Sequence, residues 1–198
     1  GDHLFVLGDV IDIHPDGIQI LQKLFRMPNV TVLLGKHEML MFGAVYKPAT
    51  PMAKRLWFDN GGRPTYEAWK KLSLEEQAEI IYKLQRCSLN TQLEIAGKTY
   101  LLAHGSPIEL FNPATSKYDH PVMHTVWARI DPDDEMPEGK LVIFGHTPTF
   151  IYQPIVPMAV WVGKQKIAID CGSGSEVGGR LCCLRLDDMK VFYSEEKE

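Results

Sequence analysis

The chain has 198 residues, of which 45% are hydrophobic and 23% are charged, and it carries a formal net charge of −4 with a sequence pI near 6.0. This composition is typical of a globular protein that buries a core, and the length favours one domain. An acidic balance argues against a protein that binds the nucleic-acid backbone, because such proteins usually carry a basic surface. No apolar run reaches the ~18 residues that span a bilayer, so we expect neither a nucleic-acid nor a membrane partner.

The cysteines and the first residues of the sequence bear on the cellular compartment in which the protein is expected. The four cysteines form no CxxC pair, and the first residues show no basic stretch followed by an apolar one. We therefore expect a reduced, cytoplasmic protein without a zinc finger. An apolar strand begins almost at residue 1, which is Gly rather than Met, and we interpret the sequence as part of a longer chain.

The first elements in chain order predict a βαβ unit. Residues 4–8 form a short apolar run that is typical of a buried strand, and residues 30–34 form a second such run. Between them, residues 16–26 place apolar side chains at helical spacing, with Asp16 as the expected N-cap. Strand, helix and strand in this order predict two parallel strands joined by a crossover.

The next stretch, at about residues 40–90, has the pattern of a helical insertion. Helices are expected near 64–72 and 74–86, and Ser73 followed by Glu76 predicts a capping box at the start of the second. We expect Trp57 and Trp69 to pack in the core of this insertion.

The remainder of the chain is rich in predicted strands. Residues 105–138 are expected to be rich in loops, and they include an acidic stretch beginning at Asp131 that is interpreted as a solvated surface. The order of elements predicts an α/β fold, namely a two-sheet sandwich flanked by helices, in a single domain over residues 1–198. The strands are predicted at 91–96, 99–103, 141–144, 149–153, 158–162, 166–170, 181–186 and 190–193.

Four segments place metal-capable side chains directly after a predicted strand. In open α/β sheets, ligand sites lie at the carboxyl ends of strands, so we expect the four segments to converge. Each residue alone has a simpler explanation as a turn residue, but carboxylates and imidazoles in this order together predict a metal site. The residues are Asp9 and Asp12 after the first strand, His37 after the second, His104 after the strand at 99–103 and His146 after the strand at 141–144.

These ordered motifs resemble the phosphoprotein phosphatase branch of the calcineurin-like metallophosphoesterases, which includes serine/threonine phosphatases and enzymes similar to bis(5'-nucleosyl)-tetraphosphatase. LGDVID is similar to the family's GDxxDRG motif, LLGKHE to its GNHE motif, LLAHGSP to its VHAG strand end and FGHTP to its GH motif. Trp127-Ala128-Arg129 is similar to the segment that carries the family's phosphate-binding arginine, so Arg129 would bind the substrate phosphate through a bidentate fork. The resemblance covers nearly the whole chain and implies the metallophosphoesterase fold.

The resemblance also implies a role for each matching residue. Asp9 would bridge two divalent metal ions, and His104 and His146 would ligate the second ion. Asp12 would orient His37, and His37 would protonate the leaving oxygen. The implied reaction is an in-line displacement by water activated at two metal ions, without a covalent phosphoenzyme.

The function implied is metal-dependent hydrolysis of phosphate esters. The expected substrates are a phosphoserine or phosphothreonine protein, or a small nucleotide polyphosphate. The expected cofactor is Mn²⁺, or else Fe or Zn. The family binds two ions, whereas this chain would bind two, one or none, depending on the departures described next.

The departures from the family pattern concern the metal and phosphate positions. The family begins with an Asp-x-His strand that would precede the segment opening this sequence. Ile13 and His14 stand where the family has Arg and Gly, so one phosphate-binding arginine is replaced by an apolar side chain. His14 is either a turn-exposed residue or a further metal ligand. Lys36 stands where the family has a metal-binding Asn, and a protonated ammonium offers no lone pair and repels a divalent ion.

Three interpretations follow from these departures. The chain is an active phosphoesterase with unusual metal chemistry, in which Asp9, His104 and His146 hold one ion. Alternatively, it is a catalytically impaired homologue, a pseudophosphatase that binds phosphate or another anion. As a third alternative, the residues at positions 13, 14 and 36 were changed deliberately in a natural enzyme.

Overall fold

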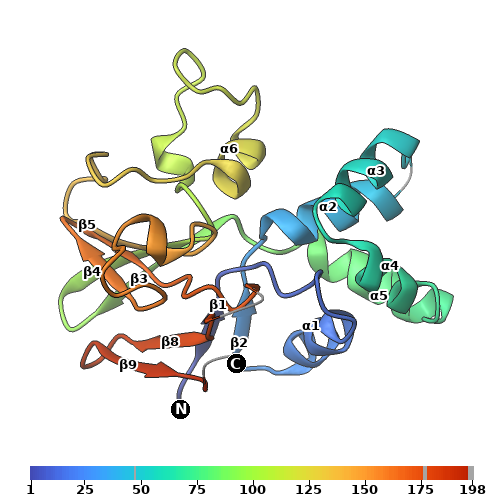
Figure 1. The fold of residues 1–198 in the computed structure, drawn as a ribbon, viewed down its shortest axis with the longest axis horizontal. Helices are drawn as coiled ribbons and strands as arrows, with labels where there is room; N and C mark the ends of the chain where they lie inside the picture. The colour runs from blue at the N-terminus through green and yellow to red at the C-terminus, as the bar shows by residue number, and fades with distance from the viewer. Residues whose placement is uncertain (47, 176–177, 196–198) are drawn as a thin grey trace. The chain divides into compact units, whose positions relative to one another are not determined.

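The computed structural model describes residues 1–46, 48–175 and 178–195. Contacts between Cα atoms divide the chain into two units, Gly1–Ser88 and Leu89–Glu198. Figure 1 shows helices α1 to α5 in the first unit and most of the β-structure in the second. The expectation of a single domain over residues 1–198 stays a prediction.

The first unit opens with the expected βαβ unit. Strand β1 (Leu4–Val6) pairs in parallel with β2 (Val30–Val32), and the intervening helix α1 (Gly17–Arg26) packs beside β2. Helix α1 buries Ile18 and Leu21, which lie three residues apart and therefore face the same side of the helix. Asp16 occupies the N-cap position as predicted, although its side chain makes no capping hydrogen bond.

The rest of the first unit is helical, as the sequence predicts. The capping box is confirmed, because the Ser73 hydroxyl accepts a bond from the Glu76 N–H and the Glu76 carboxylate accepts one from the Ser73 N–H. Trp57 is fully buried and Trp69 nearly so, in agreement with the prediction. The helices are α2 (Lys36–Val45), α3 (Pro51–Asp59), α4 (Arg63–Trp69) and α5 (Leu74–Leu84).

The second unit contains a mixed five-stranded sheet with the strand order β3-β4-β5-β7-β6. Strands β3 (Asn90–Ile95) and β4 (Lys98–Ala103) form the predicted hairpin, and β5 (Lys140–Phe144) pairs in parallel with β4. Strand β7 (Lys166–Ala168) is parallel to β5, and the edge strand β6 (Trp161–Gly163) is antiparallel to β7. A separate hairpin joins β8 (Cys182–Arg185) to β9 (Lys190–Tyr193).

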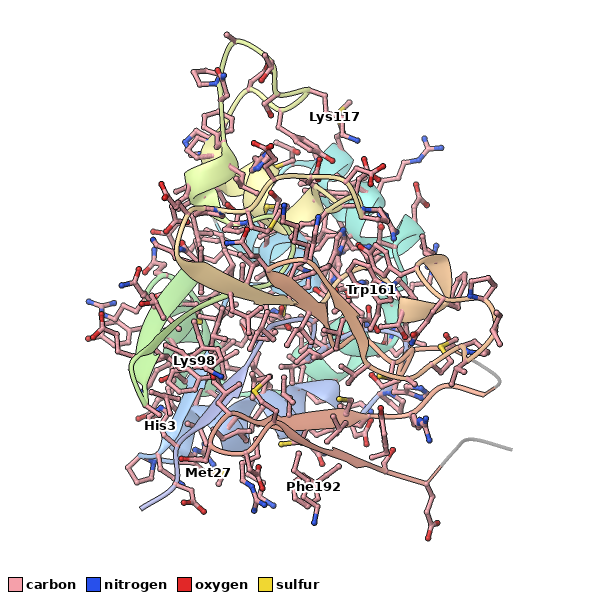
Figure 2. The ribbon with its side chains drawn as sticks, turned by 90° about the vertical axis from the view of Figure 1, so that its left-hand side faces the viewer. His3, Met27, Lys98, Lys117, Trp161 and Phe192 are labelled. Carbon is pink, nitrogen blue, oxygen red and sulfur yellow. The ribbon has the colours of Figure 1, made fainter. Side chains whose placement is uncertain are left out.

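One cluster of apolar side chains forms the core beneath this sheet. It includes Leu101 of β4, Val142 and Phe144 of β5, and Ala168 of β7, all fully buried. Trp161, labelled in Figure 2, packs at the margin of the cluster. Alternating inward-facing residues on neighbouring strands thus fix the register that positions the strand ends.

One strand prediction in this unit is wrong. Residues 149–153 are not a strand, because Pro148 starts a short 3₁₀ turn, η2 (Thr149–Ile151), in which the Ile151 N–H bonds to the Pro148 carbonyl. Residues 105–138 are rich in loops, as predicted, and they also contain η1 (Ile108–Leu110) and helix α6 (Pro121–Trp127). Pro121 stands at the first helical position, where its missing N–H costs nothing, and the His120 ring accepts a bond from the Val122 N–H.

The acidic stretch that begins at Asp131 is organised by an internal cation. Lys166 of β7 is only 1% exposed, and its ammonium donates to the carbonyls of Asp131 at 2.8 Å and Asp134 at 2.6 Å. Burial lowers the pKa of Lys166, and the neighbouring aspartates oppose that shift. Residues 131–135 are all exposed, so the predicted solvated surface is confirmed, and two backbone carbonyls of this loop bind the buried ammonium.

None of the helices among the described residues combines the length and the apolar character needed to cross a membrane. The cytoplasmic location stays a prediction.

Replacing this ammonium should destabilise the second unit. We expect Lys166→Met, which keeps the length of the side chain but leaves two carbonyls without their donor, to lower the free energy of unfolding by about 1–3 kcal/mol. Urea denaturation measures the change. Lys164→Met at an exposed position is the matched control, and equal stability of the two variants would contradict the structural role of Lys166.

Candidate functional site

The turn after β1 is held by one buried carboxylate from helix α2. Glu38 is 0% exposed, and its oxygens accept N–H bonds from Asp9 at 2.7 Å, Val10 at 2.7 Å and Ile11 at 3.3 Å. The Gly35 N–H, at the start of α2, donates to the same carboxylate at 3.2 Å. A charged acceptor shared by several backbone donors is a strong local constraint, so Glu38 fixes the path of the turn.

The same turn contains several strained residues. Eight non-glycine residues in the described part of the chain have positive φ, and three of them lie in this turn: Asp9 (55°), Asp12 (77°) and Ile13 (64°). His146 (63°), after β5 in the second unit, is another. Side chains disfavour this conformation, most of all β-branched ones such as Ile13. Such strain tends to gather at functional sites, where the surrounding structure holds it in place.

Asp12 and His37 form a buried hydrogen-bonded pair. The His37 Nδ1 lies 2.7 Å from the Asp12 Oδ2, and neither side chain is more than 11% exposed. The carboxylate can only accept, so Nδ1 carries the proton in this pair and Nε2 is the nitrogen available for proton transfer. The contact is the one that the proposed orienting role of Asp12 requires, while the catalytic role itself stays a prediction.

The charges around His37 favour its protonated form. Burial lowers the pKa of His37, but the hydrogen bond to Asp12 and the negative charges of Asp9 and Asp12 outweigh burial, and the net pKa is raised. The charge of Lys36 acts in the opposite direction. A histidine held in this way is suited to donate a proton.

Asp9 is connected to the same helix start. Its Oδ1 accepts a bond from the His37 backbone N–H at 2.9 Å, and its Oδ2 lies 3.9 Å from the His37 Nε2. Because the Asp9 side chain is 26% exposed, it retains access to solvent and to a ligand.

The three altered positions lie around this turn. Ile13 is 48% exposed, and its N–H donates to the Gly61 carbonyl at 3.0 Å. His14 is exposed, as the turn interpretation predicts. Lys36 is the first residue of α2 and is partly buried directly beside His37.

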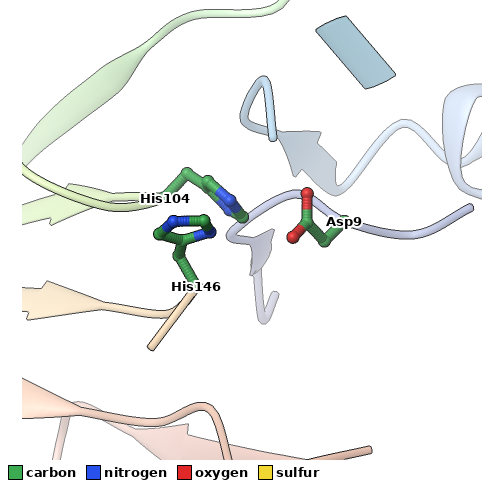
Figure 3. A group of neighbouring side chains, drawn as sticks. All are labelled: Asp9, His104 and His146. Carbon is green, nitrogen blue, oxygen red and sulfur yellow. The ribbon is translucent and has the colours of Figure 1, made fainter. Parts of the chain in front are cut away.

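In the second unit, His104 and His146 follow two adjacent parallel strands. The register pairs Ala103 with Phe144, so the residues after β4 and β5 emerge at the same edge of the sheet. The two rings lie 4.9 Å apart between centroids, and His104 is 1% exposed. Both imidazoles are labelled in Figure 3.

Helix α6 and the residues after it support these two histidines. The N–H groups of Gly105 and Ser106 donate to the carbonyls of Thr125 and Ala128, each at 3.2 Å. The His146 Nε2 lies 3.3 Å from the Trp127 carbonyl. The segment that ends α6 therefore contacts both histidine loops.

Arg129 follows immediately after that segment. Its side chain is exposed. Arg129 thus follows, in the sequence, the segment that contacts the His104 and His146 loops, and its phosphate-binding role stays a prediction.

Each unit carries side chains that could ligate a divalent metal ion. Asp9 in the first unit, and His104 and His146 in the second, each offer one ligand atom. Since the Trp127 carbonyl can only accept, the His146 Nε2 donates to it, which leaves Nδ1 with a lone pair for a metal. Carboxylates and imidazoles are common ligands for Zn²⁺ and related ions.

Sequence reasoning missed three residues at this site. Glu38 lies in the LLGKHE motif, which assigns it no role, although it holds the turn that carries Asp9. The Trp57 indole N–H donates to Asp12, and the Thr65 hydroxyl accepts the Asp12 N–H at 2.8 Å. No local pattern links residues this far apart in sequence. For Glu38, its position shortly after the predicted strand at 30–34 is a usable signal.

Comparisons with known proteins agree with the fold. Neither the protein-family models nor the curated proteins give a match. Among solved structures, the chain is similar to a hypothetical protein from Pyrococcus horikoshii, with a TM-score of 0.55 and 16% identity over 98% of this chain and 74% of the other. It is also similar to a metallophosphoesterase from Sphaerobacter thermophilus, with a TM-score of 0.52 and 16% identity over 100% of this chain and 79% of the other.

This chain has the metallophosphoesterase fold. The predicted fold class is thereby confirmed as α/β, with a mixed sheet and helices. At 16% identity, the likeness extends to the fold and not to the phosphoprotein phosphatase branch.

Removing the charge of Glu38 should disrupt the turn. An amide at this position accepts through one oxygen and turns an NH₂ group towards backbone donors, so we expect Glu38→Gln to lower the free energy of unfolding by about 2–4 kcal/mol. Chemical denaturation followed by tryptophan fluorescence measures this change. Glu75→Gln, in the exposed first turn of α5, is the control, and a loss no larger than that of the control would contradict the role of Glu38.

Proposed function

We propose that this protein hydrolyses phosphate esters with the help of a bound divalent metal ion. The observation that carries the proposal is the buried Asp12–His37 hydrogen bond at 2.7 Å, in which Asp12 belongs to a strained turn that also bears the Asp9 carboxylate. The similarity of the fold to that of a metallophosphoesterase supports the proposal.

Each residue has a distinct part in the proposed reaction. His37 donates a proton from Nε2 to the leaving oxygen, and Asp12 holds the ring so that Nδ1 remains protonated. Arg129 binds the phosphate through its planar guanidinium. These are general acid catalysis and substrate positioning, and both can be tested by substitution.

Asp9, His104 and His146 would hold the metal ion in this proposal. A bound divalent ion supplies Lewis acidity, which lowers the pKa of water and neutralises charge on phosphoryl oxygens. We propose Mn²⁺ as the first ion to test, with Zn²⁺ and Fe as alternatives. The proposed substrates are phosphoserine or phosphothreonine in a protein and small nucleotide polyphosphates, within the cytoplasm.

A second function is favoured by Lys36. An ammonium at the first position of α2 adds positive charge at a helix N-terminus beside His37. In that alternative, the protein is a pseudophosphatase that binds a phosphate group without hydrolysing it. Ile13 in place of an arginine is consistent with either function, since it removes one phosphate contact.

Metal content and turnover distinguish the two functions. If the protein is a phosphoesterase, it should bind Mn²⁺ and hydrolyse p-nitrophenyl phosphate, and His104→Ala should lose both properties because it removes a metal ligand. We expect the loss of turnover to exceed about a hundredfold. Metal analysis and product absorbance provide the two measurements.

The control is His3→Ala, because His3 is exposed before β1, at the end of the strand away from the turn. Phosphate binding without metal and without turnover would support the pseudophosphatase. If His104→Ala bound metal and turned over substrate as the unmodified protein does, the proposed ligand set would be wrong.

Substitution of Lys36 tests whether its charge opposes the metal. If the ammonium repels the ion, Lys36→Asn should lower the Kd for Mn²⁺ by about tenfold or more, which corresponds to about 1.4 kcal/mol of removed repulsion. Titration calorimetry measures the Kd. Lys36→Arg keeps the charge and should leave the Kd near that of the unmodified protein, whereas an unchanged Kd in Lys36→Asn would exclude this effect of Lys36.

A further inference from the structure

The Asp12 carboxylate has a second donor, and it comes from the helical insertion. The Trp57 indole Nε1 lies 3.0 Å from Oδ1 and 2.9 Å from Oδ2, so its N–H is shared between both oxygens. His37 contacts Oδ2 from the other helix. The carboxylate is thus held between an indole of α3 and an imidazole of α2, and all three side chains are buried.

The backbone of Asp12 is fixed by the next helix. Its N–H donates to the hydroxyl of Thr65 in α4, at 2.8 Å, and Thr65 is 1% exposed. The following residue, Ile13, donates to the Gly61 carbonyl in the turn between α3 and α4. Both the main chain and the side chain of Asp12 are therefore bonded to the same helical pair.

The turn between these helices is fitted closely to the indole. A Cβ atom added at Gly62 would lie 2.3 Å from the Trp57 Nε1, a separation that real Cβ atoms do not reach. The Gly62 N–H also donates to the Trp57 carbonyl at 3.1 Å. The absence of a side chain at Gly62 therefore lets the turn approach the indole.

The chemistry of the indole explains why its position matters. An indole N–H can only donate, so it pairs with carboxylate oxygens and does not compete for the proton on His37. Without this donor, the Asp12 carboxylate would be free to rotate about its terminal torsion, which is soft in aspartate. A rotated carboxylate would no longer align the His37 ring for proton donation.

We infer that Trp57 and Thr65 are positioning residues for the Asp12–His37 pair, and that helices α3 and α4 are therefore part of the apparatus that delivers the proton to the leaving group. This inference rests on the proposed phosphoesterase function. It assigns the helical insertion a role in the chemical step, in addition to its packing role in the first unit.

The inference predicts an effect that depends on the leaving group. An alkyl phosphate needs a proton on its departing oxygen, whereas p-nitrophenyl phosphate releases a stable anion without one. With Mn²⁺ added, Trp57→Phe should lower kcat for an alkyl phosphate by about tenfold to a hundredfold more than kcat for p-nitrophenyl phosphate, with KM little changed. Thr65→Val, which removes only the hydroxyl, should change kcat in the same direction by a smaller factor.

Two further variants separate positioning from general damage. Trp69→Phe changes a second buried tryptophan, which lies in α4. This variant should change kcat for the two substrates by the same factor. In a His37→Ala background, adding Trp57→Phe should produce no further change in the ratio of the two kcat values. An equal loss on both substrates for Trp57→Phe, or an additional loss in the His37→Ala background, would overturn the inference.

A spectroscopic measurement tests the contact without relying on activity. The indole N–H resonance of Trp57 is assigned by its disappearance in Trp57→Phe, and its exchange with deuterium should be slow in the unmodified protein. Asp12→Ala should accelerate that exchange by about tenfold or more, because the acceptor is lost. Unchanged exchange would overturn the inference.

The two measurements also distinguish failure of the inference from failure of the proposed function. If the unmodified protein hydrolyses neither substrate, the proposed function fails, and with it the kinetic role assigned to Trp57, even where exchange shows that the indole contact exists. If the unmodified protein is active and the leaving-group effect is absent, only the inference fails. Should Trp57→Phe not fold, as judged by circular dichroism, Thr65→Val and the exchange measurement decide the question.

Discussion

The first unit depends on one buried carboxylate. Glu38 accepts the backbone N–H groups of Asp9, Val10 and Ile11, and it does so from a helix that begins at the end of the neighbouring strand. A Cβ atom added at Gly35 would lie 2.3 Å from the Asp9 nitrogen, so the helix start and the turn are in direct contact. This contact holds the turn in a conformation that its side chains would otherwise avoid.

The consequences reach both catalytic candidates of that unit. Helix α2 supplies Glu38, which holds the turn, and His37, which is held in return by Asp12 and Asp9 of the same turn. In the second unit the equivalent constraint is the parallel register of β4 and β5, together with the end of α6. In each unit the polar side chains are positioned by backbone hydrogen bonds, which permit little adjustment.

The altered positions stand out against this intact framework. Ile13 retains a positive φ although it is β-branched, and Lys36 begins α2 next to a fully buried Glu38. The contacts around Asp12 and His37 are thus formed with Ile13 and Lys36 in place.

The sequence alone determined the local elements: the βαβ unit, the Ser73 capping box and the order of polar residues after strands, because periodicity and capping act over a few residues. The tertiary structure decided the rest. The Asp12–Thr65 bond joins residues 53 apart, and the Trp57–Asp12 bond joins residues 45 apart. The Lys166 contacts with its loop span 32 and 35 residues. A hydrogen bond depends on position in space, and a local pattern carries no information about a partner so far along the chain.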